Sequence, residues 1–111
     1  MHRTSLTHMS GFRLKYVKSN DAYICDIGSQ DINGTYRDIF QHTNYIGVDI
    51  VKAKGVDVVS NKPYSYPFDD NYFDFVVSGQ TLEHVKYPAK IMAEAYRLLK
   101  TDGVCCVIAP S

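Results

Sequence analysis

Five short apolar runs recur along the chain, and turn-forming residues separate them. The runs are rich in β-branched and aromatic residues, and several are apolar almost throughout instead of alternating with polar residues. Such runs are typical of strands that are covered on both faces, as in a parallel sheet between two layers of helices. The expected strands cover residues 22–27, 45–49, 56–59, 73–78 and 104–109.

The segment after the first strand has the spacing of an amphipathic helix over residues 33–42. Thr35 stands three positions before Asp38, which is the spacing of a capping box at a helix start. The apolar residues that would share one face are Tyr36, Ile39 and Phe40.

A second helix is expected over residues 88–100, after the fourth strand. Pro88 suits a first helical turn, and Lys100 followed by Gly103 suits a helix end. Strands and helices that alternate along a chain indicate an α/β fold.

The connection between the second and third strands is too short for a helix. Only residues 50–55 separate them, whereas a parallel crossover normally needs a dozen or more residues. Either this crossover is a bare loop and the third strand is short, or residues 56–59 are not a strand.

The composition is that of an ordinary globular domain. The chain has 111 residues, 45% of them hydrophobic and 22% charged, so we expect a single domain over residues 1–111. No stretch approaches the ~20 apolar residues that a membrane helix needs. The first residues also lack the apolar block of a signal peptide, and we expect no membrane association.

The charges balance overall, with 12 basic and 12 acidic residues, but they are unevenly distributed. Residues 1–18 contain four basic residues and no acid, so they carry +4 and the remainder carries −4. An acid-poor start is a feature of transit peptides, but we favour a solvated basic helix or tail over residues 1–20. With no net field and no recognisable module, nucleic-acid binding is not expected.

The three cysteines, Cys25, Cys105 and Cys106, lie in apolar runs and lack metal-binding spacing. Buried free thiols fit this pattern better than disulfides or a zinc site, and we expect a reducing, cytoplasmic location.

The candidate ligand site begins at the end of the first strand. Asp26 ends this strand, Gly28 follows, and Gly34 precedes the expected helix. A glycine just after a strand lets a ligand approach the backbone closely, and a helix start offers free N–H groups. The spacing matches neither the dinucleotide fingerprint nor a phosphate-binding P-loop, and a plain glycine turn is the alternative.

Asp49 ends the second strand, 21 positions after Gly28. A carboxylate there can accept hydrogen bonds from the two vicinal hydroxyls of a ribose. The alternative is an aspartate that only caps a turn. Together, Asp49 and the glycine loop favour a ligand of the adenosine type.

Five motifs in this order resemble class I S-adenosylmethionine-dependent methyltransferases, of the methyltransferase type 11 group, across residues 22–109. They are Asp26-Ile27-Gly28, Gly47-Val48-Asp49, the stretch from Pro67 to Asp74 (PFDDNYFD), Leu82-Glu83-His84-Val85, and Arg97-Leu98-Leu99-Lys100 followed by Gly103. The resemblance implies a three-layer, Rossmann-like α/β sandwich with a mostly parallel sheet in the order 3-2-1-4-5. It also implies S-adenosylmethionine as cofactor and a small-molecule methyl acceptor.

The resemblance further implies which residues bind the cofactor. The loop from Asp26 to Gly34 would wrap its methionine part, Asp49 would hold the ribose, and Ile50 would lie against the adenine. The full set is Asp26, Gly28, Ser29, Gln30, Gly34, Asp49, Ile50, Asn61, Ser78, Gly79 and Gln80. The last three would border the sulfonium and the opening for the acceptor.

The chain also departs from the family. The acid that often follows the third strand is replaced by Ser60 or Asn61, and Asn61 can hydrogen-bond adenine only without charge. The family's sheet usually continues with two further strands after the fifth, which this chain lacks. An exposed fifth strand predicts either self-association, which would make a homo-oligomer, or marginal stability.

Three further groups could carry chemistry. His84 is the best-placed base for a hydroxyl or amine acceptor, although such a histidine often only packs a helix start. Asp69 and Asp70 form a pair of carboxylates, but neighbours on a turn usually point apart, so no metal site is expected. Tyr64, Tyr66 and Tyr72 cluster in one loop and either line a substrate opening or pack on the sheet edge.

The function expected is methyl transfer from S-adenosylmethionine to a small acceptor, chiefly by alignment and exclusion of water. One alternative is a non-catalytic cofactor-binding domain or a fragment of a longer methyltransferase. A second is a nicotinamide-dependent reductase, because an acid after the second strand also suits that cofactor's ribose.

Overall fold

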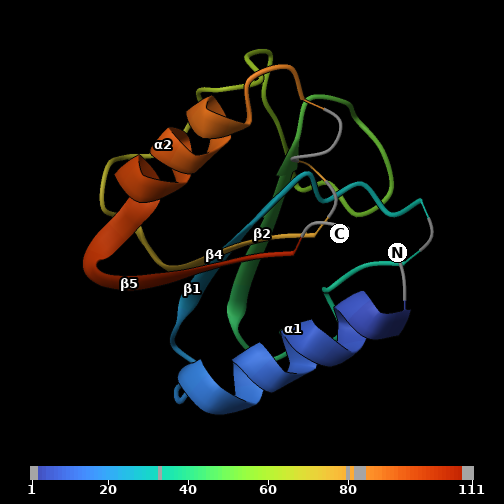
Figure 1. Ribbon diagram of the computed structural model, residues 1–111, viewed down its shortest axis with the longest axis vertical. Helices are drawn as coiled ribbons and strands as arrows, with labels where there is room; N and C mark the ends of the chain where they lie inside the picture. Colours follow the sequence, from blue (N-terminus) through green and yellow to red (C-terminus); the bar gives the residue numbers. More distant parts are fainter. Residues whose placement is uncertain (1–2, 33, 80, 82–84, 109–111) are drawn as a thin grey trace.

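The computed structural model describes residues 3–32, 34–79, 81 and 85–108, and its centre is a five-stranded sheet (Figure 1). In chain order the elements are α1 (Arg3–Tyr16), β1 (Tyr23–Ile27), β2 (Asn44–Asp49), β3 (Val58–Val59), β4 (Phe73–Ser78), α2 (Pro88–Leu98) and β5 (Leu99–Val107). All neighbouring strands are parallel, and their order across the sheet is β3-β2-β1-β4-β5, as predicted.

The two helices cover opposite faces of the sheet, which makes the three layers expected (Figure 1). Cys25 belongs to the core beneath α2 with Ile91, whereas its neighbour Ile24 belongs to the core beneath α1 with Met9. Because consecutive side chains of a strand point to opposite faces, the continuous apolar runs of the sequence fill both cores.

The basic N-terminal segment is a packed helix, so the expectation of a solvated one was wrong. Met9 and Phe12 of α1 are buried against the sheet, and the hydroxyl of Ser5 hydrogen-bonds that of Tyr36. The basic residues lie on the other side of the helix or at its end, where Arg13 donates to the carbonyls of residues 39 and 41.

The helix predicted over residues 33–42 is not formed in the described part of that segment, which consists of turns. Thr35 accepts from the N–H of Arg37, two residues on, and so closes a local turn instead of a capping box. The guanidinium of Arg13 donates to the carbonyls of Ile39 and Gln41, at 2.7 and 2.9 Å. At the end of the segment, His42 has a positive φ of 69°. The backbone bonds of the segment are mostly of the i→i+3 type, such as Ile39 to Tyr36 at 2.9 Å, with one i→i+4 bond from Phe40 to Tyr36 at 3.2 Å. Tyr36 and Phe40 are buried as predicted.

The boundary between α2 and β5 lies earlier than predicted. The last carbonyls of the helix are bonded to the chain just before β4. The N–H groups of Asn71 and Tyr72 donate to the carbonyls of Arg97 and Leu98, at 2.8 and 2.9 Å. Leu99 then pairs with Phe73, so Lys100 and Gly103 lie within β5 and do not end the helix. A register shift between Phe73 and Phe75 accommodates the extra residues.

The short connection between β2 and β3 is a bare loop, which settles the alternative left open by the sequence. Val48 pairs with Val58 and Asp49 with Val59, so the third strand exists but has only two residues. The loop returns to β2 because the N–H of Asp57 donates to the carbonyl of Gly47 at 2.9 Å.

Arg97 of α2 holds the loop that leads into β4. It donates to the carbonyls of Tyr66 and Phe68 at 3.0 and 2.9 Å and pairs with Glu94 and Asp70 at 2.6 and 2.7 Å. The Glu94 carboxylate also accepts the N–H of Tyr66. The motif residues around Arg97 therefore have a structural role that fixes the walls of the site described next.

The cysteines are free, as predicted, with Cys25 buried and Cys105 and Cys106 half-buried. Burial raises the pKa of the Cys105 thiol to about 11, which keeps it protonated and unreactive at neutral pH. Within residues 3–32, 34–79, 81 and 85–108, no helix has the length and apolarity to cross a membrane.

Candidate functional site

The carboxyl ends of β1, β2 and β4 meet at one edge of the sheet. The pairing of β1 with β4 ends at Asp26 and Val77, which leaves the carbonyl of Ile27 beyond the ladder. That carbonyl instead accepts the hydroxyls of Ser78 and Thr81, at 2.9 and 2.8 Å. The connections after β1 and β4 depart on different sides here, which is where open α/β sheets bind ligands.

Gly28 stands at the centre of this crevice. Its φ of +77° is a conformation that residues with side chains rarely adopt, and its N–H donates to the carbonyl of Val48 at 2.8 Å. A β-carbon on Gly28 would overlap the hydroxyl of Thr81. The space of the missing side chain is therefore occupied by Thr81, and Gly28 contributes bare backbone to the wall of the cavity described next.

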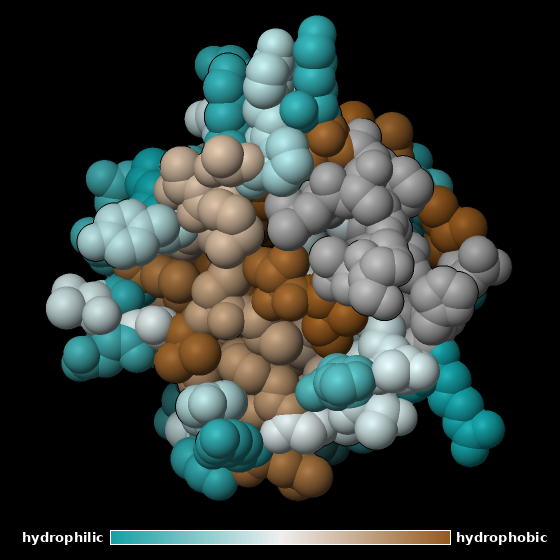
Figure 2. Space-filling model, viewed as in Figure 1, coloured by the Kyte–Doolittle hydropathy of each residue, from teal (hydrophilic) through white to brown (hydrophobic). Residues whose placement is uncertain are grey.

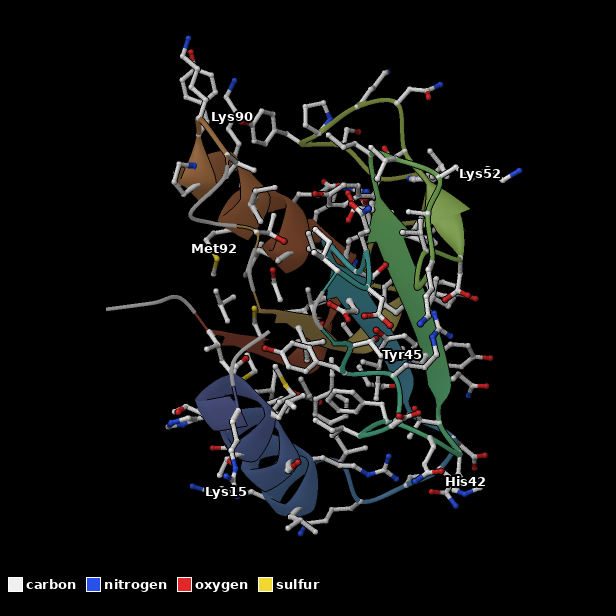
Figure 3. All side chains as sticks on the ribbon, turned by 90° about the vertical axis from the view of Figure 1, so that its right-hand side faces the viewer. Lys15, His42, Tyr45, Lys52, Lys90 and Met92 are labelled. Carbon is white, nitrogen blue, oxygen red and sulfur yellow. The ribbon has the colours of Figure 1, made fainter. Side chains whose placement is uncertain are left out.

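A cavity of about 250 Å³ opens beside Gly28. Its walls are Gly28, Gln30, Ile32, Asp49, Ile50, Pro63, Tyr66, Thr81, Val85 and Ile91. In Figure 3, Lys52 marks the end of β2 that forms this edge, and Lys90 marks the start of α2 beside it. One polar wall and one apolar wall suit a ligand with a hydroxylated part and a flat apolar part, such as a nucleoside.

Asp49 supplies the polar wall of the cavity. One of its carboxylate oxygens accepts a hydrogen bond from the backbone N–H of Gln30 at 3.1 Å. The other accepts one from the backbone N–H of its neighbour Ile50 at 2.7 Å. Each carboxylate oxygen has a further lone pair, so two acceptor positions are left for a ligand. This geometry fits the vicinal hydroxyls of a ribose, and the two backbone donors fix the carboxylate in place.

A second, small hollow of about 10 Å³ lies next to this cavity and shares Gly28 and Gln30 with it. Its other lining residues are Asp26, Ser29, Thr35, Tyr36 and Gly79. Burial raises the pKa of the Asp26 carboxyl to about 7, while a hydrogen bond from Tyr45 and the charge of Arg37 act in the opposite direction. The hollow thus contains a carboxyl group that ionises near neutral pH.

The structure brings seven of the predicted cofactor residues to these two cavities. They are Asp26, Gly28, Ser29, Gln30, Asp49, Ile50 and Gly79. The hydroxyl of Ser29, however, is buried against Gly47 of β2 and has no hydrogen-bond partner among the described residues.

Three predicted residues lie elsewhere. Gly34, with a φ of +125°, donates its N–H to Asp31 and shapes the loop. Ser78 is buried, and its hydroxyl donates a hydrogen bond to the carbonyl of Ile27. Asn61 is exposed and lines neither cavity, because the Ser60 hydroxyl bends the loop by bonding to two of its carbonyls. Gln80 and His84 lie outside the described residues.

The sequence did not reveal several residues of the site. Pro63, Tyr66, Val85 and Ile91 form the apolar wall, but as isolated apolar residues they are indistinguishable from core positions. Thr81 carried no motif of its own, and only the hydroxyl bond to Ile27 shows that it lies over Gly28. Tyr45 was read only as part of a strand, and its bond to Asp26 depends on the register of β1 and β2.

Other candidate groups do not form sites in the described part of the chain. Asp69 and Asp70 are exposed, Asp70 pairs with Arg97, and no cluster of potential metal ligands is found there. A wider groove of about 730 Å³ lies at the opposite edge of the sheet, beside Asp74 and Lys100. That groove is open, its Lys100 and Asp74 pair with each other at 3.2 Å, and it contains none of the predicted site residues.

Residues 25–107 match the protein-family model described as a methyltransferase domain. The chain is 35% identical over 60 residues to 2-methyl-6-phytyl-1,4-hydroquinone methyltransferase 1, chloroplastic, of Oryza sativa subsp. japonica. That match covers 54% of this chain and 18% of the rice protein. An uncharacterized protein of Methanocaldococcus jannaschii is 38% identical over 65 residues, which cover 52% of this chain and 32% of that protein.

Solved structures share the fold. The YcgJ protein of Bacillus subtilis superposes with a TM-score of 0.73 and 24% identity, covering 92% of this chain and 48% of the other. A putative S-adenosyl-L-methionine-dependent methyltransferase of Methanococcus maripaludis gives a TM-score of 0.69 and 18% identity, covering 93% of this chain and 56% of the other. The chain thus spans about half of these structures and less than a third of the two curated relatives named above.

Proposed function

Because the chain belongs to the methyltransferase domain family, whose methyl donor is S-adenosylmethionine, we propose that it binds this cofactor across the tips of β1, β2 and β4 and transfers the methyl group to a small-molecule acceptor. The observation that carries the proposal is the juxtaposition of Gly28 and Asp49 on one cavity. Gly28 contributes bare backbone to the cavity wall beside the Thr81 hydroxyl, and Asp49 offers two acceptor positions to a ribose.

The residues present fit the cofactor. Asp49 would hold the ribose hydroxyls, and Ile50 with Pro63 would enclose the adenine. Asp26 and Gly79 line the hollow on the other side of Gly28, where the methionine part would lie. When bound, S-adenosylmethionine supplies a methyl group on a sulfonium, which is an activated leaving group, so the protein needs no nucleophile of its own.

The chain's own contribution is alignment and exclusion of water. Tyr66 and Ile91 are buried side chains on the apolar wall of the cavity and keep water from that side. The hydroxyl bonds from Ser78 and Thr81 to the carbonyl of Ile27 fix the distance between the β1 and β4 tips. A ligand held at Gly28 is therefore positioned relative to an acceptor that enters past Gly79.

His84, which lies outside the described residues, is proposed as the base that accepts the proton of a hydroxyl or amine acceptor. Replacing it by Gln should lower turnover and leave the dissociation constant of the cofactor unchanged. Weakened cofactor binding in His84→Gln would instead indicate a binding role.

The acceptor is proposed to be a small organic molecule, and a hydroquinone is the first to try. The support is the similarity to two rice proteins named 2-methyl-6-phytyl-1,4-hydroquinone methyltransferases. Transfer of a labelled methyl group to simple hydroquinones and phenols, with formation of S-adenosylhomocysteine, is the direct measurement.

Calorimetric titration with S-adenosylmethionine and, separately, with reduced nicotinamide dinucleotide tests the binding step. Saturable binding of the first alone supports the proposal. Binding of the dinucleotide alone supports a reductase instead, and cofactor binding without transfer to any acceptor supports a binding domain or a part of a larger enzyme.

A further inference from the structure

A row of four side chains runs from the surface to the tip of β1. The hydroxyl of Tyr45, on β2, donates a hydrogen bond to the carboxylate of Asp26. The guanidinium of Arg37 lies over the Tyr45 ring, 4.6 Å from its centroid, and pairs with Asp57 at 2.7 Å. Tyr45 is labelled on β2 in Figure 3.

Backbone groups of β2 and the loop after it hold the outer end of this row. The carboxylate of Asp57 accepts the N–H of Gly47 at 2.7 Å, and the carbonyl of Gly55 accepts from Arg37 at 3.3 Å. Arg37 is thus fixed over the ring by an ion pair, a hydrogen bond and a cation–π contact, so the Tyr45 hydroxyl has one defined orientation.

The inner end of the row is a carboxyl group with an unusual environment. Asp26 is only 3% exposed and lines the small hollow beside Gly28. Burial raises its pKa to about 7, the Tyr45 hydrogen bond and Arg37 lower it, and Asp49 raises it. Among the described residues, the other titratable group facing it is Tyr36, from the turn after the glycine loop.

The pKa of Asp26 is thus set by opposing effects of burial and of its neighbours. A further positive charge close to this carboxyl lowers its pKa, so the carboxyl loses its proton. S-Adenosylmethionine has two such charges, a sulfonium and an ammonium. The hollow is where the proposed function places the methionine part, so the two observations concern the same few residues.

We propose that Tyr45, held by Arg37, is a positioning residue that presents the Asp26 carboxylate to a cationic centre of S-adenosylmethionine, so that cofactor binding drives the proton of Asp26 into solvent. The inference rests on the proposed function. No other bond changes in this step, and the proton is taken up by the buffer.

The test counts the protons released, by calorimetric titration of the 111-residue chain with S-adenosylmethionine in buffers of different ionisation enthalpy. At pH 6.5 an α-ammonium keeps its proton, so released protons come from the protein. The wild type should release about three quarters of a proton per cofactor at this pH, the fraction of Asp26 that is still protonated.

The Tyr45→Phe variant removes only the hydroxyl and leaves the ring beneath Arg37. Without this hydrogen bond, Asp26 should hold its proton more tightly in the free protein. The number of protons released on cofactor binding at pH 6.5 should therefore approach one, and the dissociation constant of S-adenosylmethionine should rise several-fold. The ratio of dissociation constants, variant to wild type, should fall toward one between pH 6 and 8.5. The matched control is Tyr96→Phe, because Tyr96 is 83% exposed on α2, and it should behave as the wild type.

Each outcome decides the inference. Binding by the wild type without proton release overturns it, as does a ratio of dissociation constants that does not change with pH, which would mean a merely structural Tyr45. Release with both S-adenosylmethionine and S-adenosylhomocysteine supports it with the ammonium as partner, and release with the first alone supports it with the sulfonium. No cofactor binding by the folded wild type is instead a failure of the proposed function.

Discussion

The hydroxyl of Thr81 lies directly over Gly28, in the space that a β-carbon on this glycine would need. Gly28→Ala must therefore displace Thr81 and also adopt a φ of +77°. We expect it to lower the free energy of unfolding by about 1–3 kcal/mol and to weaken cofactor binding. Denaturant unfolding and calorimetric titration measure the two effects.

Gly11 provides the matched control for this substitution. It lies in α1, and a β-carbon there would meet nothing within 4 Å. Gly11→Ala should be neutral or stabilise by up to about 1 kcal/mol, since alanine is the better helix former. Equal effects of the two substitutions would contradict the argument from the Thr81 contact.

Asp49→Ala tests the ribose contact. The variant loses a charged acceptor, so the free energy of cofactor binding should weaken by about 1–3 kcal/mol. Asp49 also anchors the N–H groups of Gln30 and Ile50, and Asp49→Asn, which keeps one acceptor oxygen, separates the two roles. An unchanged dissociation constant in both variants would exclude Asp49 from the ribose site.

Arg97→Ala should destabilise the protein without touching the cofactor site directly. Removing the guanidinium takes a donor from the carbonyls of Tyr66 and Phe68 and leaves the buried carboxylate of Glu94 without its counter-charge, with only the N–H of Tyr66 as donor. A loss of about 2–4 kcal/mol in unfolding free energy is expected. Tyr96→Ala, one position away and exposed, should change it by less than about 0.5 kcal/mol.

The pH dependence of stability should carry the signature of Asp26. Its pKa is raised from 3.8 in the unfolded chain to about 7 in the fold, so the native state favours the protonated carboxyl. The resulting stabilisation is fully present below pH 3.8, declines as the pH rises and is lost above about pH 7. Asp26→Asn cannot ionise, and its stability relative to the wild type should increase by about 2–4 kcal/mol from pH 4 to 8. A constant difference between the two proteins over this range would contradict the raised pKa.

The edge formed by β5 leads to a prediction about association. Within the described residues, β5 pairs with β4 on one side only, and Val104, Cys105, Cys106 and Val107 are half-exposed. Figure 2 shows the hydrophobic surface that runs across the molecule in this region. We expect concentration-dependent self-association in sedimentation velocity, reduced by Val107→Lys, because a charge blunts strand-to-strand pairing. A single monomeric species at high concentration would contradict it.

The sheet between two helical layers could be predicted because its signals are local, and the strand order was implied by the family resemblance. Runs such as Phe73–Ser78 are apolar on both faces, and only a sheet between two layers buries both. The helix expected near Tyr36 was wrong: mostly i→i+3 bonds close successive turns there, and the positive φ of His42 ends the segment before a regular helix forms. The start of β5 was missed, since Leu99 extends only because Phe73 pairs with it.

The same distinction holds for the site. Gly28 and Asp49 could be predicted because their places at strand ends are visible in the sequence. Thr81 and Tyr45 could not, because their roles depend on which residues the parallel register brings opposite Gly28 and Asp26. Asn61 lines neither cavity, and the sequence does not show the turn in which the Ser60 hydroxyl bonds to the carbonyls of Lys62 and Ser65.

The bond between Ser5 and Tyr36 has a practical consequence. Through it, the first turns of the chain support the ring that packs on Gly79, where a β-carbon would collide with Tyr36. Shortening the amino terminus past Ser5, or fusing a bulky tag there, should therefore loosen the pocket some thirty residues away. Affinity tags for assays are therefore better placed at the carboxyl terminus.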